Sequence, residues 1–203
     1  MDYKFFKRIF DICFSLIGFV ITFPILLITA IAIKIESSGP IIFKQERIGL
    51  YGKVFRIYKF RSMSVGAEKG GVYETKGDSR VTKVGRIIRK TSIDELPQFI
   101  NILRGEMSLI GPRPALTYHP WPYSEYTEEQ KRMFYVRPGV TGWAQVNGRK
   151  DVEWPKRIEL NIEYVDKISF YFDLMIFIKT IFKVIKMEGN LNVKETAKKN
   201  ITG

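Results

Sequence analysis

The chain has 203 residues, which is enough for one domain of ordinary size with a real hydrophobic core. Its formal net charge of +12 indicates an anionic partner: nucleic acid, anionic lipid or a phosphorylated substrate. Zinc-finger spacing, RNA-binding aromatic signatures and helix-turn-helix patterns are all absent from the sequence, so we expect no nucleic-acid partner. The single cysteine, Cys13, excludes an intrachain disulfide framework. With one histidine, His119, any metal must be held mainly by oxygen ligands, which favours magnesium or manganese over zinc.

The segment from Ile12 to Ile33 contains no charged residue and, as a helix, is long enough to span a bilayer. Pro24 lies near its middle, where it removes the hydrogen bond to the carbonyl of Val20 and kinks the helix. Basic residues flank both ends: Lys4, Lys7 and Arg8 before it, and Lys34, Lys44, Arg47, Lys53 and Arg56 after it. Because positive flanks stay in the cytoplasm, we predict a re-entrant helix–break–helix in residues 1–36. A plain kinked transmembrane helix is the alternative.

Residues Pro40 to Met63 are expected to form a small β-hairpin. An apolar start is followed by a turn around Gly49 to Gly52 and then by the β-rich run VFRIYKF. In an extended strand Lys59 and Arg61 share one face, so they are expected to project together, although a solvated strand end explains the same pattern. Residues 64–79 are polar and glycine-rich, which predicts a mobile loop that is either dispensable or a lid.

Two adjacent carboxylates, Asp94 and Glu95, lie between cationic clusters. The flanking cations are Arg86, Arg89 and Lys90, on a predicted short helix over 82–90, and Arg104 and Arg113 beyond. Pro97 and the apolar residues after it predict a helix that stops at Gly105, with both carboxylates ionised at its positive end. Carboxylates among arginines suit phosphate chemistry. Ser92 and Glu95 equally fit a capping box, and the residues alone do not decide between the two.

The run from Gly111 to Pro114 predicts a rigid turn, because its two prolines restrict the backbone around Arg113. A guanidinium on a stiff loop suits bidentate phosphate binding, and a plain surface turn is the alternative. Further along, Asn147 and Gly148 predict a tight turn. The glycines follow neither the Rossmann nor the Walker pattern, so they do not identify a nucleotide site.

Two helices are expected near the C-terminus. Glu153 to Ile168 has an apolar side and is predicted to be amphipathic. Ser169 to Lys186 is apolar and aromatic with a stripe of Lys179, Lys183 and Lys186. Such a helix lies in the headgroup plane, with its lysines on lipid phosphates and Phe170, Phe177 and Phe182 in the acyl boundary. A buried core helix with one wet edge is the alternative. Residues 187–203 are predicted to be a loosely ordered polar tail.

Several ordered blocks together resemble the bacterial sugar transferase family, the monotopic polyprenyl-phosphate phosphoglycosyl transferases. The blocks are KRIFD (7–11), FKQERIG (43–49), IYKFRSM (57–63), SIDELPQ (92–98), MSLIGPRP (107–114) and VRPGVTGWAQVNGR (136–149). The resemblance runs from the N-terminus to about Lys186. It implies transfer of a sugar 1-phosphate from a UDP-sugar to polyprenyl phosphate, with Mg²⁺, at the cytoplasmic face of the bacterial inner membrane.

The resemblance also implies roles for individual residues. Asp94 is the expected nucleophile and Glu95 its metal-holding partner, so both are expected metal ligands. The expected phosphate and substrate contacts are Lys59, Arg61, Arg89, Arg113, Arg137, Gln145 and Arg149. The last three are assigned to the donor only weakly, because they suit loop stabilisation equally well. Pro24 marks the expected break in the membrane helix.

We therefore predict a mostly helical α/β protein with a re-entrant N-terminal helix (1–36), a cytoplasmic catalytic domain with interfacial amphipathic helices (37–186) and a tail (187–203). UDP-sugar, polyprenyl phosphate and anionic lipid are the expected partners, and a homo-oligomer is compatible with the sequence. The rival hypothesis is a non-catalytic basic module on the membrane surface, in which Asp94 and Glu95 only cap a helix. The sequence leaves the sugar and the pathway open.

Overall fold

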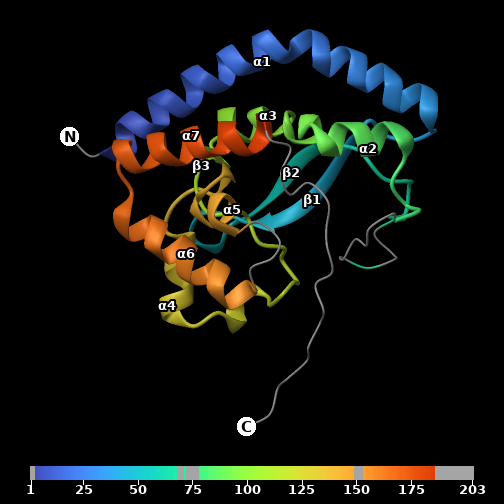
Figure 1. The fold of residues 1–203 in the computed structure, drawn as a ribbon. Helices are drawn as coiled ribbons and strands as arrows, with labels where there is room; N and C mark the ends of the chain where they lie inside the picture. The colour runs from blue at the N-terminus through green and yellow to red at the C-terminus, as the bar shows by residue number, and fades with distance from the viewer. Residues whose placement is uncertain (1–2, 68–70, 72–77, 149–152, 186–203) are drawn as a thin grey trace.

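A single long helix, α1 (Tyr3–Glu36), arches over one side of the molecule in the computed structural model (Figure 1). The structure describes residues 3–67, 71, 78–148 and 153–185. Beneath α1 lie two small sheets and a set of short helices, which makes the fold mostly helical with a minor β component, as predicted. The predicted tail, 187–203, lies outside the described residues.

Helix α1 bends at its middle and does not break. It is helical through Pro24, so the predicted helix–break–helix is wrong as a statement about secondary structure. Proline removes only one backbone hydrogen bond, and the neighbouring turns hold, so bending is sufficient. Thr22 Oγ1 donates to the carbonyl of Gly18 at 2.7 Å, a type of bond that also bends helices. Within the described residues α1 is also the only helix long and apolar enough to cross a membrane.

The first turns of α1 are held to the domain by a buried polar network. Asp173 accepts hydrogen bonds from Tyr3 Oη and Lys7 Nζ, both at 2.6 Å, and from Tyr164 Oη at 2.7 Å. Asp11 accepts from Ser108 Oγ and from the backbone N–H of Leu109, both at 3.0 Å. Burying such groups is unfavourable unless they are paired, so this end of α1 has a specific place on the domain.

The last turn of α1 docks on the same domain. Ile33 is buried against Phe60 and Ile88. Glu36 accepts from the backbone N–H of Lys83 at 2.6 Å, the first residue of α2 (Lys83–Lys90). Both ends of the apolar helix are therefore fixed to one body.

The predicted hairpin is confirmed. Strands β1 (Ile42–Ile48) and β2 (Val54–Phe60) pair antiparallel, with Ile42 opposite Phe60 and Ile48 opposite Val54. The turn between them contains η1 (Leu50–Gly52) and is closed by the bond from Gly49 N to Lys53 O at 2.8 Å. Phe55 and Ile57 on β2 pack on Ile102 and Met107, which attaches the hairpin to α3 (Gln98–Leu103).

A second, parallel pair joins β3 (Ser108–Ile110) to β4 (Gly139–Thr141). Glycines make this close approach possible. A Cβ on Gly139 would lie 2.1 Å from the amide nitrogen of Gly111. A Cβ on Gly142 would lie 1.9 Å from the carbonyl oxygen of the same Gly111. A side chain at either place would push the two strands apart. This close contact fixes the start of the 111–114 turn beside β4.

The remaining short elements include several that pack against the C-terminal helices. They are η4 (Tyr123–Glu125), α4 (Glu128–Lys131) and η5 (Arg132–Phe134), followed after β4 by α5 (Trp143–Gly148). The expected tight turn at Asn147 and Gly148 is wrong, because both residues end α5. Asn147 Nδ2 donates to the Trp143 carbonyl at 2.8 Å, which satisfies this helical turn locally.

Both predicted C-terminal helices are confirmed, as α6 (Trp154–Lys167) and α7 (Phe170–Ile185). The lysine stripe of α7 turns inward instead of toward lipid: Lys179 Nζ lies 4.7 Å from the centre of the Trp143 ring, and Lys183 Nζ lies 3.4 Å from the Gln145 carbonyl. Lys186 lies outside the described residues. The aromatic face is exposed as expected, with Phe177 47% and Phe182 60% exposed.

Helices α1 and α7 lie on the same side of the molecule (Figure 1) and touch through the rings of Phe10 and Phe170, whose centres are 6.2 Å apart. Along α1 many large apolar side chains face outward, including Val20 at 69% and Ile21 at 70% exposed. An apolar surface of this extent marks an interaction site for membrane or protein.

Candidate active site

The acid pair lies in a short 3₁₀ turn, η3 (Ile93–Glu95), between α2 and α3. Ser92 precedes it with φ +59°, and its side chain caps no backbone N–H. An N-cap residue needs an extended backbone conformation, which Ser92 does not have. The capping box is therefore not formed, and the carboxylate of Glu95 is directed at other partners.

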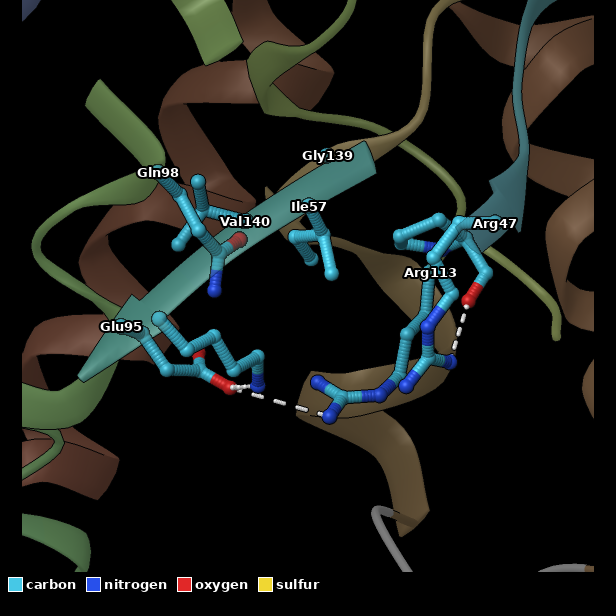
Figure 2. A pocket seen from close by; sticks show the side chains of 9 residues that line it. Arg47, Ile57, Glu95, Gln98, Arg113, Gly139 and Val140 are labelled. Atoms are coloured by element: carbon cyan, nitrogen blue, oxygen red, sulfur yellow. Dashed lines mark hydrogen bonds and ion pairs between the residues drawn. The ribbon is translucent and has the colours of Figure 1, made fainter. Parts of the chain in front are cut away.

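Those partners are two of the predicted phosphate-binding cations. Glu95 Oε1 lies 2.6 Å from Lys59 Nζ, at the end of β2, and 3.7 Å from Arg113 Nη2, on the 111–114 turn (Figure 2). The Lys59 and Glu95 side chains are 17% and 24% exposed, whereas Arg113 is 45% exposed. Three segments distant in sequence thus converge on one carboxylate, and Arg113 retains access to solvent.

Asp94 has a different environment from Glu95. Removal from water, with a smaller contribution from the negative charge of Glu95, raises the pKa of Asp94 from 3.8 to about 6. The charges of Lys59, Arg89 and Arg113 act in the opposite direction. The expectation that a helix dipole keeps this carboxylate ionised is therefore wrong in its cause: α3 begins only at Gln98, and desolvation dominates. With a pKa near 6 the carboxylate remains mostly ionised at pH 7.

Arg47 is a site residue that sequence reasoning counted only as a basic flank. It lines the same cavity as Lys59, Glu95 and Arg113 (Figure 2), donates from Nη1 to the Pro114 carbonyl at 3.0 Å, and has a buried Nε without a partner in the described part of the chain. Burial, then repulsion from Arg113, lowers its pKa to about 10. The register of the hairpin is the signal that could have identified Arg47. Residues paired across antiparallel strands share one face, so Arg47 faces inward with the buried Phe55.

The other predicted contacts lie in different places. Arg61 does not project with Lys59: its guanidinium is buried at the end of α1, where it donates to the carbonyls of Ser37 and Ser38 at 2.8 and 2.6 Å. Arg89 donates from Nε to Ser62 Oγ at 2.7 Å and lies close enough to Asp94 to lower its pKa. The structure thus groups Arg89 with the acid pair and separates Arg61 from it.

The weakly assigned donor contacts are dispersed. Arg137 Nε donates to the Gly105 carbonyl at 2.9 Å, and the side chain lines a second cavity away from Glu95. Gln145 buries both amide atoms without a hydrogen bond in the described residues. Arg149 lies outside the described residues.

The cavity at Glu95 is small, about 10 Å³, the size of a single water site. Arg47, Arg113, Glu95 and Gln98 line it (Figure 2), and so does Lys59. Of these cations, Lys59 and Arg113 both contact the Glu95 carboxylate.

The donor set is compatible with magnesium. Within the described residues no group of three or more His, Cys, Asp or Glu side chains meets a metal-site geometry, so the acid pair stands without further protein ligands of these types. Mg²⁺ commonly takes one or two carboxylates and completes its shell with water and substrate phosphates. Asp94 and Glu95 fit that pattern, and they do not fit a closed zinc site.

Comparison with known proteins identifies the family. The model of the family described as "Bacterial sugar transferase" matches residues 2–187, and the chain belongs to this family. It is 43% identical over 198 residues to the uncharacterized sugar transferase EpsL of Bacillus subtilis (strain 168), covering 97% of this chain and 96% of the relative.

Two relatives have names that state a reaction. The chain is 43% identical over 183 residues to UDP-glucose:undecaprenyl-phosphate glucose-1-phosphate transferase of Escherichia coli (strain K12), covering 87% of this chain and 39% of that protein. It is 42% identical over 187 residues to UDP-N-acetylgalactosamine-undecaprenyl-phosphate N-acetylgalactosaminephosphotransferase of Aeromonas hydrophila. This match covers 90% of this chain and 44% of that protein. The chain thus spans about two fifths of the length of these two relatives.

The pKa of Asp94 provides a direct test of the site geometry. In protein labelled with ¹³C at the aspartate carboxyls, Asp94 should titrate near pH 6, and Asp78, whose pKa Arg80 lowers to about 2, should titrate far below it. Lys59→Met should raise the Asp94 pKa further, because it removes a positive charge. Glu95→Gln should lower it, because it removes a negative charge. An Asp94 that titrates near 4 in all three proteins contradicts the described environment.

Proposed function

We propose that the chain transfers a sugar 1-phosphate from a UDP-sugar to polyprenyl (undecaprenyl) phosphate and releases UMP. The observation that carries the proposal is the site itself: Asp94 is desolvated with a pKa near 6, next to a Glu95 carboxylate that binds two cations. Membership in the bacterial sugar transferase family, and the reactions in the names of two relatives, support the same activity.

In the proposed reaction Asp94 is the nucleophile. Its carboxylate oxygen attacks the phosphorus linked to the sugar, the P–O bond to the uridine phosphate breaks, and UMP leaves with that electron pair. A phosphate oxygen of polyprenyl phosphate then attacks the same phosphorus and releases the Asp94 carboxylate, giving a polyprenyl diphosphate sugar. A carboxylate that is mostly ionised at pH 7 but poorly solvated is suited to the first step.

The cations around the acid pair supply charge neutralisation for this chemistry. Lys59 and Arg113 are positioned by Glu95, and Arg89 lies within electrostatic reach of Asp94. A diphosphate that displaces Glu95 from these cations would replace one anion by another, so the site need not bury an uncompensated charge. Arg47 lines the same cavity as Arg113, and we expect it to position the Pro114 turn through its bond to the Pro114 carbonyl.

Magnesium is part of the proposal. Asp94 and Glu95 would hold the ion, and the bound ion would neutralise charge on the transferring phosphate.

The rival hypothesis, a non-catalytic basic module, loses its main structural support. It requires Asp94 and Glu95 to act as a helix cap, but Ser92 has a left-handed backbone and makes no capping bond. A cap also gives no reason for desolvating one carboxylate while pairing the other with two cations.

We further propose that the protein is bound to the cytoplasmic face of the bacterial inner membrane with α1 re-entrant. Both ends of α1 are bonded to one domain: Lys7 to Asp173 at the start, and Glu36 to the backbone of α2 at the end. A straight crossing would place one end on the far side of the bilayer and break one of these contacts. The exposed apolar side chains of α1 and α7 support insertion from one face.

Replacing the nucleophile tests the reaction. With purified protein, Mg²⁺, undecaprenyl phosphate and a panel of UDP-sugars, the wild type should release UMP from at least one donor. Asp94→Asn should reduce release by at least about a thousandfold, because the attacking oxygen is lost while size is kept. Asp166→Asn alters the exposed ion pair between Asp166 of α6 and Arg132 of η5, and it should leave the release of UMP unchanged. Asparagine also suits an N-cap, so an active, folded Asp94→Asn variant contradicts the proposal.

Cysteine labelling tests the topology. Lys4→Cys and Ser38→Cys, each in a Cys13→Ser background, place single thiols at exposed positions on the two sides of the apolar segment. In intact cells both should resist a membrane-impermeant maleimide, and both should react after permeabilisation. Labelling of position 4 without position 38 in intact cells would establish a full span and contradict the re-entrant arrangement.

A further inference from the structure

Gln98, the first residue of α3, carries a buried amide that has no role in the proposed reaction so far. The residue is 2% exposed, and its side chain makes no hydrogen bond within the described residues. It lines the cavity at Glu95, and its amide end points toward the side of the cavity where Glu95 lies (Figure 2). Burying an amide without a partner is unfavourable, so buried amides are almost always hydrogen-bonded. An amide left unpaired at a cavity wall therefore indicates a partner from outside the protein.

Asn101, one turn further along α3, shows the contrast with an amide that has a structural role. It is fully buried, and its Oδ1 accepts from the backbone N–H of Tyr58 at 2.9 Å. Its Nδ2 donates to the Arg56 carbonyl and to Glu106 Oε2, both at 2.7 Å. These bonds attach α3 to β2. Because Asn101 already joins the two elements, the unpaired amide of Gln98 is not needed for that attachment.

The wall of the cavity carries more positive than negative charge. Arg47, Lys59 and Arg113 line it, together with one carboxylate, that of Glu95. Lys59 and Arg113 share this carboxylate. Arg47 donates to a backbone carbonyl and to Gln45 Oε1, and within the described residues it makes no ion pair. A buried cation without a counter-ion is unfavourable, so the cavity suits an anionic atom better than a neutral one.

The size of the cavity limits what can enter. Its volume of about 10 Å³ accommodates one water molecule or one oxygen atom of a larger ligand. Part of the wall is rigid, because Gly139 packs against the backbone of Gly111 too closely for a Cβ to fit. Asp94 does not line the cavity. An oxygen bound there is therefore beside the nucleophile, and the rest of its phosphate lies outside the cavity.

From these observations we propose that Gln98 is a substrate-contacting residue that donates a hydrogen bond from its amide to one non-bridging oxygen of the donor diphosphate. The charge of Arg47, in the same wall, favours an anionic oxygen at that place. The contact selects oxygen over sulfur, because sulfur is larger and is a weaker hydrogen-bond acceptor. The identity of the substrate rests on the proposed function, whereas binding of an anion against Gln98 does not require turnover.

Binding of inorganic diphosphate tests the contact without turnover. Titration calorimetry at constant ionic strength would use full-length protein carrying Asp94→Asn, so that no covalent step follows. Gln98→Met keeps the length of the side chain but removes its N–H, and it should weaken diphosphate binding about tenfold, as loss of a hydrogen bond to a charged group predicts. Gln98→Glu adds a negative charge and should weaken binding further. Gln130→Glu adds the same charge in α4, outside the cavity, and should have no effect.

Thermal melts without diphosphate separate a substrate contact from a packing role. Because the Gln98 amide has no partner in the described part of the chain, Gln98→Met should not lower the melting temperature. Asn101→Leu removes the bonds between α3 and β2 and should lower it by about 5 °C or more. A destabilised Gln98→Met variant with unchanged diphosphate binding would show that Gln98 only packs the core, and it would overturn the proposal. If Gln98→Met does not fold, Gln98→Glu, which has the same shape, provides the binding comparison.

Donor analogues test the selection of oxygen during turnover. In each analogue sulfur replaces one non-bridging oxygen of a UDP-sugar that the wild type accepts. The analogue that places sulfur against Gln98 should be a poor donor by kcat/KM for UMP release. Gln98→Ala enlarges the cavity, so it should reduce the ratio of kcat/KM values, oxygen donor over that analogue, at least about fivefold. For the other analogues the ratio should be the same in both proteins.

Two results overturn the proposal: diphosphate binding that is the same with Gln, Met and Glu at position 98, or oxygen-to-sulfur ratios that Gln98→Ala leaves unchanged for every analogue. Failure of the proposed function has a different signature, since the wild type would then release UMP from no donor. In that case diphosphate binding alone decides whether Gln98 contacts an anion.

Discussion

The ion pair between Lys59 and Glu95 connects the parts of the protein that make the site. Lys59 is the penultimate residue of β2, Glu95 belongs to η3 before α3, and the 2.6 Å contact between their side chains joins these two elements. Arg113 reaches the same carboxylate from the 111–114 turn. The start of this turn is fixed by the close approach of Gly111 to Gly139 and Gly142. Asp94, next to this ion pair, is removed from water, and this desolvation raises its pKa. Ionising it is unfavourable by about 3 kcal/mol relative to water, for a pKa near 6 instead of 3.8.

Local patterns in the sequence predict much of this arrangement. Apolar periodicity and turn residues give the hairpin and helices α2, α6 and α7 close to their observed bounds. They also give the stop of α3 at Gly105, which has φ +82°. The acid pair and its proximity to Lys59 and Arg113 follow from the family resemblance, since composition and spacing left a helix cap and a functional site equally open. The structure decides against the cap through one backbone angle, at Ser92.

The expectations that failed depend on long-range contacts. Strand alternation places Lys59 and Arg61 on one face, but Arg61 lies beyond the strand and binds the end of α1. Lys179 and Lys183 form a stripe in sequence that suits lipid phosphates. In the structure Lys179 contacts the Trp143 ring and Lys183 contacts the Gln145 carbonyl. Arg47 was missed for the opposite reason, because its inward direction follows from pairing with Phe55. The partners of Arg61, Lys179 and Lys183 are far along the chain, and no local pattern contains them.

The central claim is that Asp94 carries the sugar phosphate during the reaction. Wild-type protein incubated with the donor and Mg²⁺, but without lipid acceptor, should be quenched and digested, and its peptides analysed by mass spectrometry. The account predicts a sugar phosphate adduct on Asp94 that disappears when undecaprenyl phosphate is added before the quench. An adduct on another residue, or acceptor-dependent product formation with no adduct trapped at any time, would contradict it.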